Sequence, residues 1–139
     1  MTDRRLRSGN RAEKRRDHRR DRRRERGAAA EEAAIRYLSS LGYQVLARNW
    51  RCRSGEIDLI ARDGEVLVFV EVRSRRAGSR YGAAVEAVTP RKIHKVREVA
   101  GVYLTFHPYT AGPVRFDVVA VTLRPDDSVA DLRHIKAAF

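Results

Sequence analysis

Acidic side chains on two adjacent apolar runs are the residues of this sequence whose types and spacing could do chemistry. Glu56 and Asp58 precede the dipeptide Asp63-Gly64, and Glu71 lies in the apolar run that follows it. Such a dipeptide between apolar runs is a strong hairpin signal, so we expect the two runs to pair as antiparallel strands. Because side chains alternate between the faces of a strand, these carboxylates are expected to converge on one face.

A turn formed by Asp63-Gly64 fixes the expected register, with Asp58 opposite Phe69 and Glu56 opposite Glu71. Asp58 and Glu71 are then diagonal neighbours with backbone positions on the order of 7 Å apart, and their side chains can reach a shared ion. Glu56 directly opposite Glu71 would be destabilising without a cation or a basic partner. Oxygen ligands without a Cys/His cluster favour Mg²⁺ or Mn²⁺ over zinc. The pattern therefore indicates a divalent metal site.

The same alternation also describes the solvent-facing side of an ordinary antiparallel hairpin. In that interpretation the acidic groups are surface residues, and Arg73 forms a cross-strand ion pair. Three apolar residues expected on the same face favour a partly covered site instead: Ile60, Leu67 and Phe69. The opposite face is expected to carry Ile57, Leu59, Val66, Val68, Val70 and Val72.

Periodicity and turn residues predict the elements that must position these side chains. Apolar residues at helical spacing predict one helix between Gly27 and Gly42. A second helix is opened by Thr89-Pro90 and extends to about residue 106. Runs of β-forming residues predict strands at 43–52, 56–62, 65–73, 114–123 and about 129–136. The expected fold is α/β with the order α-β-β-β-α-β-β. In the strand at 114–123, Asp117 is expected to form an ion pair with Arg115 or Arg48.

Positive charge is concentrated at the N-terminus. Residues 1–26 hold 13 Arg or Lys against 5 Asp or Glu, a balance of +8 in a chain of net charge +12. This composition predicts a tail that is disordered or, through ion pairs between residues four apart, partly helical, followed by one domain at 27–139. Its basic character favours a polyanionic partner, with nucleic acid preferred to membrane. The tail is either a solubilising arm or a dedicated binding element.

The N-terminus has no apolar run behind its charges, so neither a signal peptide nor a transmembrane helix is expected. We therefore expect a cytoplasmic protein with no membrane partner. Cys52 is the one cysteine of the chain, and core packing is its expected role.

Four segments resemble the YraN-type family: GAAAEEAAIRYLSSLGY at 27–43, GEIDLIA at 55–61, VFVEVRSR at 68–75 and RFDVVAV at 115–121. The similarity spans residues 27–139 in order. That family is similar to archaeal Holliday-junction resolvases, within the restriction-endonuclease-like fold, whose sites combine an Asp with a Glu-x-Lys pair. The resemblance implies a restriction-endonuclease-like core, a mixed β-sheet flanked by helices. It also implies a metal-dependent phosphodiesterase ancestry and, by analogy with the resolvases, a homodimer.

Carried over to this sequence, the resemblance implies that Asp58 and Glu71 are metal ligands and that Glu31 is the helix glutamate of the site. From the sequence alone, Glu31 equally suits the N-terminal end of a helix dipole. Glu56 is expected to support the ligands without touching the ion. Arg73 stands where the superfamily pattern has lysine, and arginine stays protonated, so it can neutralise phosphate charge but cannot act as a base.

Basic residues near the expected ligands are candidates for nucleic-acid contacts. Arg75, Arg76 and Arg80 follow Glu71 closely and suit a groove that tracks a phosphate backbone, although an ordinary basic loop has the same composition. Lys92 and Lys95, on the second helix, are further candidates and either could replace the missing lysine, unless they simply face solvent.

Two functions remain in competition. The first is a nucleic-acid-binding, Mg²⁺- or Mn²⁺-dependent endonuclease-like protein that hydrolyses phosphodiester bonds, with DNA favoured as substrate. The second is a non-catalytic nucleic-acid-binding protein or adaptor that kept the nuclease fold. The arginine at position 73 favours the second.

Overall fold

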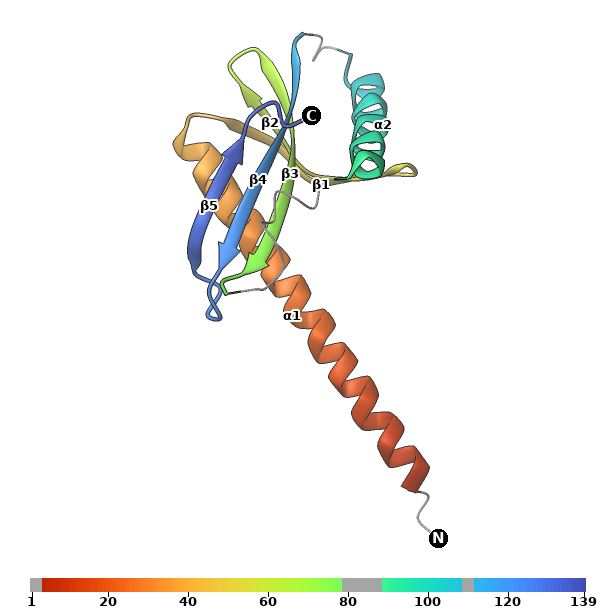
Figure 1. Ribbon diagram of the computed structural model, residues 1–139. Helices are drawn as coiled ribbons and strands as arrows, with labels where there is room; N and C mark the ends of the chain where they lie inside the picture. The colour runs from red at the N-terminus through yellow and green to blue at the C-terminus, as the bar shows by residue number, and fades with distance from the viewer. Residues whose placement is uncertain (1–3, 79–88, 109–111) are drawn as a thin grey trace.

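The computed structural model describes residues 4–78, 89–108 and 112–139, with side chains from residue 11 onward. Its elements are α1 (Arg4–Ser40), β1 (Gln44–Cys52), β2 (Gly55–Asp63), β3 (Val66–Arg76), α2 (Pro90–Phe106), β4 (Val114–Leu123) and β5 (Val129–Ile135) (Figure 1). This confirms the α/β class and the order α-β-β-β-α-β-β.

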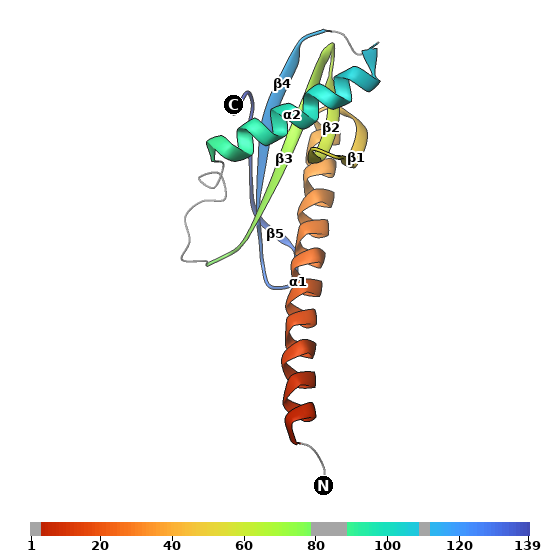
Figure 2. The same cartoon turned by 90° about the vertical axis from the view of Figure 1, so that its right-hand side faces the viewer.

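The sheet is mixed, as expected, with its five strands in the order β1-β2-β3-β4-β5. Neighbours are antiparallel except β3 and β4, which are parallel. A parallel pair needs a crossover connection, and α2 lies within that connection. The two helices pack on opposite faces of the sheet (Figure 2).

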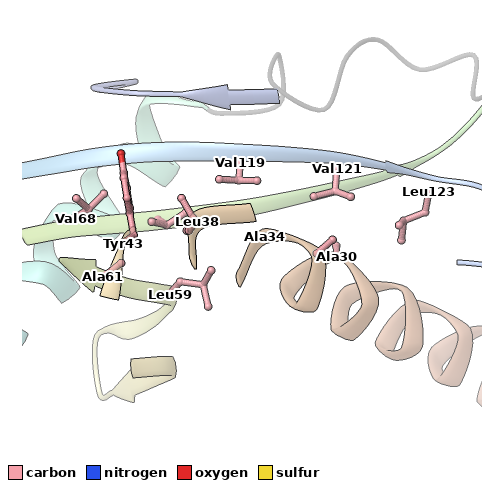
Figure 3. Close-up of a cluster of buried hydrophobic side chains, with 12 residues drawn as sticks. Ala30, Ala34, Leu38, Tyr43, Leu59, Ala61, Val68, Val119, Val121 and Leu123 are labelled. Atoms are coloured by element: carbon pink, nitrogen blue, oxygen red, sulfur yellow. The ribbon is translucent and has the colours of Figure 1, made fainter. Parts of the chain in front are cut away.

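The α1 face of the sheet carries the larger apolar cluster (Figure 3). Ala30, Ala34 and Leu38 are at most 1% exposed and lie over buried residues of β2, β3 and β4. Alanine at the contact lets the helix backbone approach the strands closely. On the other face, Tyr103 of α2 packs edge-on against Phe69, with ring centroids 5.7 Å apart. The face that carries Ile60, Leu67 and Phe69 is thus covered, as predicted, and the element that covers it is α2.

Helix α1 begins far earlier than the expected helix, which was bounded by Gly27. The structure has one helix from Arg4 through Gly27 to Ser40, and residues 11–25 are all exposed. The N-terminal half projects away from the sheet in both views (Figures 1 and 2). Apolar periodicity marks only the part of a helix that packs, and glycine inside a helix costs only about 1 kcal/mol, so neither signal locates the true start. Among the described residues, no helix is long and apolar enough to cross a membrane.

The hairpin register differs from the predicted one. Asp63 pairs with Val66, so the turn is Gly64-Glu65 and not Asp63-Gly64. Gly64 has φ +59°, and Glu65 is not among the residues with positive φ, which agrees with a turn that needs glycine at its first central position. The shift of one residue in the turn moves each pairing by two, so side chains within the paired residues 59–63 and 66–70 keep their predicted faces while their partners change.

A buried ionic network joins β4 to β5 and to the C-terminus. Asp117 is fully buried and accepts hydrogen bonds from Arg115 Nε at 2.8 Å and from the Ala137 backbone N–H at 3.0 Å. Its other oxygen lies 2.8 Å from His134 Nε2. Burial raises the pKa of Asp117, but these hydrogen bonds outweigh it and hold the pKa below its ordinary value. Of the two expected partners, Arg115 is the one that binds Asp117, and Arg48 pairs with Glu32.

Replacing Asp117 with asparagine is expected to lower the free energy of unfolding by about 3 kcal/mol, because it leaves the Arg115 guanidinium with the more exposed Asp63 as its remaining counter-charge. Asp131→Asn is the matched control: Asp131 pairs with Arg133 on the surface, where both side chains are more than half exposed. It should change stability by less than about 1 kcal/mol. Equal losses in the two variants, measured by urea unfolding, would contradict this assignment.

Candidate active site

The candidate site lies where pairing between β2 and β3 stops. The last ladder pair on this side is Leu59 with Val70. Beyond it, Asp58 Oδ2 accepts a hydrogen bond from the Val72 backbone N–H at 2.8 Å. The carboxylate thus takes the place of a strand carbonyl, and the corrected register sets Asp58 level with Glu71.

The side-chain alternation of β2 is interrupted at Asp58. Leu59 packs in the α1 cluster, whereas Ile57 packs in the α2 cluster, so the prediction that these two residues share a face is wrong. In β1, the pairs on either side set Asn49 opposite Asp58, and Asn49 has φ +48°. A non-glycine residue in this region is uncommon and often marks a functional position. Two neighbouring strands are therefore irregular at the same level.

Glu71 is buried beneath α2, at 6% exposure, and has two cations near it. Lys92 Nζ lies 3.2 Å from Glu71 Oε1, and Arg73 Nε lies 4.0 Å from the same oxygen. Lys92 belongs to the first turn of α2, where its backbone N–H binds the side chain of the cap residue Thr89 at 3.2 Å. The helix cap therefore positions the backbone of Lys92, from which the side chain reaches the carboxylate.

Glu31 approaches the same place from α1. Its Oε2 accepts a hydrogen bond from Asn49 Nδ2 at 3.1 Å, which ties the helix to the irregular position of β1. Its negative charge also acts on Asp58 and raises the pKa of that carboxyl group. Glu31, Asp58 and Glu71 thus come from three elements, α1, β2 and β3.

Asp58 is the strongly perturbed acid of the site. Burial raises its pKa to about 7, and the charge of Glu71, a hydrogen bond with Glu71 and the charge of Glu31 act in the same direction. The Val72 N–H opposes these effects because it stabilises the carboxylate. A cation beside Asp58 would oppose these effects, because it would stabilise the charged carboxylate.

The predicted convergence of Glu56 with these acids is wrong. Glu56 turns to Arg51 Nε, 2.8 Å away, on the exposed side of β2. Throughout the described part of the chain, no three His, Cys, Asp or Glu side chains are grouped to hold a metal ion. Within these residues Asp58 and Glu71 are therefore a pair of acids, and neither Glu31 nor Glu56 joins them as a grouped third ligand.

The other basic candidates lie apart from the carboxylates. Lys95 extends along the turn between β1 and β2, where its Cε would be 3.3 Å from a Cβ added at Gly55. Arg75 and Arg76 lie at the end of β3, paired with the last residues of β4. Arg80 lies outside the described residues.

Asn49 is the residue that sequence reasoning missed. Asparagine is depleted in strands and enriched among non-glycine residues with positive φ. Its occurrence within the β-forming run 43–52 was therefore a usable signal.

The raised pKa of Asp58 gives stability a pH dependence of known sign. Because the folded-state pKa lies above the ordinary 3.8, the contribution of this group is complete below about pH 4 and is lost as the pH rises through about 7. Asp58→Asn removes the charge and keeps an oxygen for the Val72 N–H. With EDTA present, this variant should be more stable than the native protein by roughly 3 kcal/mol at pH 8, with little difference at pH 4.

Glu56→Gln is the control for this pH profile, because its exposed ion pair with Arg51 should contribute less than about 1 kcal/mol at either pH. Unfolding by urea at the two pH values measures the effect. An Asp58→Asn variant that is equally or less stable than the native chain at pH 8 would contradict the burial of a charged carboxylate here.

The comparisons with known proteins agree on one family. The family model described as "Uncharacterised protein family UPF0102" matches residues 30–121, which include every residue of the candidate site. A UPF0102 protein of Frankia casuarinae is 47% identical over 113 residues, covering 81% of this chain and 94% of the relative. A UPF0102 protein of Symbiobacterium thermophilum is 52% identical over the same length and with the same coverage of both chains. The chain therefore belongs to the UPF0102 family, which is the YraN-type family that its motifs resemble.

Proposed function

We propose that this protein binds DNA and hydrolyses its phosphodiester bonds with Mg²⁺ or Mn²⁺ held by Asp58 and Glu71. The observation that carries the proposal is the pairing of two acids at the end of the β2–β3 ladder, where one of them cannot ionise freely. Perturbed acids of this kind concentrate at functional sites. The family resemblance to resolvases supplies the reaction class.

The donor set fits a hard divalent cation. Asp58 and Glu71 offer carboxylate oxygens, and a cation would offset both the burial of the Asp58 charge, which is the main cause of its raised pKa, and the nearby charge of Glu71. When bound, the ion supplies an activated water and polarises the phosphoryl oxygen. Glu31 adds a third negative charge from α1 and, through Asn49, holds the irregular strand in place.

Lys92 fills the role for which the superfamily pattern has a lysine at position 73. Its ammonium group is 3.2 Å from Glu71, closer than the guanidinium of Arg73 at 4.0 Å. Lysine can give up a proton and so can serve as a general acid or base, which arginine cannot. Arg73 remains suited to neutralise charge on the phosphate. Lys92 would thus transfer the proton and Arg73 would neutralise phosphate charge, two roles that one lysine has in the superfamily pattern.

A non-catalytic nucleic-acid-binding protein is the second candidate. The observation in its favour is that Lys92 and the Val72 N–H already bind the two acids, so the fold does not need a metal to satisfy them. Such a protein would keep its salt-dependent affinity for DNA and show no metal-dependent cleavage. A homodimer remains a prediction for either candidate.

Nicking of supercoiled, single-stranded and four-way-junction DNA, with Mn²⁺ or Mg²⁺ and with EDTA, tests the proposal. We expect metal-dependent cleavage by the native protein and a loss of about 100-fold or more in Asp58→Asn and Glu71→Gln, because both remove a ligand charge. DNA affinity in EDTA should stay within about twofold. Glu56→Gln, on the same strand but paired with Arg51, is the matched control and should cleave normally.

Lys92→Gln and Lys95→Gln form a second matched pair, because both remove one lysine charge from α2 while only Lys92 reaches Glu71. Lys92→Gln should slow cleavage about 100-fold and Lys95→Gln should not, as expected for a proton-transfer group. Native protein that binds DNA without cleaving any of the substrates would favour the second candidate. Cleavage retained by Asp58→Asn would remove the proposed site from consideration.

A further inference from the structure

The projecting part of α1 carries charges that are sorted by face. Residues 11–26, here called the arm, contain ten Arg or Lys and four Asp or Glu. The side chains of residues 11–25 are all exposed, and the arm lies N-terminal to the residues matched by the family model. Its chemistry is therefore separate from that of the site between β2 and β3.

The acids of the arm recur at every fourth residue: Glu13, Asp17, Asp21 and Glu25. At about 100° per residue this spacing advances by only about 40°, so all four lie within one sector of roughly 120°. The remaining sector of about 240° is free of carboxylates, and its basic residues span about 180° of it. It carries Arg11, Arg15, Arg16, Arg19, Arg20, Arg22, Arg23 and Arg26. Lys14 and Arg24 lie on the acidic side.

The basic sector points the same way as the face of α1 that packs against the sheet. Counting along the continuous helix, the buried Ala30, Ala33 and Ala34 fall within the angular range of the basic sector. The arginine face therefore continues the packing face beyond the end of the sheet. Figure 2 shows the backbone of the arm leaving the end of the sheet, and the angular positions place the arginine face on the side toward the sheet.

Arg76, at the end of β3, adds to this arginine face. A pocket there is lined by Arg22 and Arg26 of the arm together with Arg76, and by Glu25, Pro125 and Asp127. Three guanidinium groups against two carboxylates leave the pocket positive. The arginine side chains of the arm and Arg76 of β3 thus line the same pocket and form one basic surface.

We propose that the arm binds double-stranded DNA side-on, with its arginine face and Arg76 against the phosphate backbone and with Glu13, Asp17 and Asp21 toward solvent. This inference rests on the proposed function for its choice of DNA as the polyanion. Insertion of the arm into the major groove is disfavoured, because a helix there has phosphates on both sides and the acidic sector would meet one of them. A straight helix of 16 residues, about 24 Å long, suits the regular phosphate rows of a duplex.

Two double variants with the same net charge test the sorting of charge. Arg15→Gln with Arg22→Gln removes two charges from the arginine face, and Lys14→Gln with Arg24→Gln removes two from the acidic side. Binding to a 20-base-pair duplex is measured by fluorescence anisotropy in EDTA at several salt concentrations, and circular dichroism checks that both variants keep equal helix content. EDTA excludes any contribution from metal-dependent cleavage.

The face variant should bind about tenfold more weakly, with a salt-dependence slope lower by about 1.8, and the control should stay within about twofold. Equal losses in the two variants would mean that net charge alone attracts DNA, and no loss in either would remove the arm from the interface. An equal loss on a single strand of the same sequence would overturn the preference for a duplex. If only the Arg15→Gln/Arg22→Gln variant loses affinity and the native protein cleaves no DNA, the DNA-binding role of the arm would be supported and the nuclease proposal would be refuted.

Discussion

The hydrogen bond from the Val72 N–H to the Asp58 carboxylate is the interaction on which the candidate site depends. It ends the β2–β3 ladder, places an acid level with Glu71, and leaves that acid largely surrounded by protein. An acid so placed has its pKa raised to about 7 by burial and by its neighbours. The fold thus holds two acidic side chains, Asp58 and Glu71, close together, and ionisation of Asp58 is unfavourable there.

Helices on both sides of the sheet bring further charged residues to this pair of acids. On one side α1 brings Glu31, which Asn49 binds, and on the other α2 brings Lys92 to Glu71 from its capped first turn. The network around Asp117 works differently, because its buried carboxylate has matched donors and a lowered pKa. Asp117 is thus matched by donors on both oxygens, whereas Asp58 has one backbone donor and a raised pKa beside Glu71.

Much of the fold followed from the sequence because it rests on local signals. Period-two alternation identified the strands and the face shared by Glu71 and Phe69, and Thr89-Pro90 marked the start of α2. The turn was misplaced by one residue because Gly64 can serve at either central position. The contacts of Glu56 were missed because alternation fails at Asp58, and the positive φ of Asn49 that accompanies this failure is set by tertiary packing. Ion pairs between residues four apart predicted that the arm could be partly helical, and it is helical from Arg4. Its continuity with the packed helix was missed because the exposed arm buries no apolar residue that would give a periodic signal.

The most direct test of the central claim is the effect of Mn²⁺ on thermal unfolding of the native protein and of Asp58→Asn at pH 7.5. If Asp58 and Glu71 hold a divalent cation, saturating Mn²⁺ should stabilise the native protein, by about 2.7 kcal/mol at 100 times the dissociation constant, and should leave Asp58→Asn nearly unchanged. The same Mn²⁺-induced shift in both proteins, or no shift in either, would contradict a cation site at these two acids.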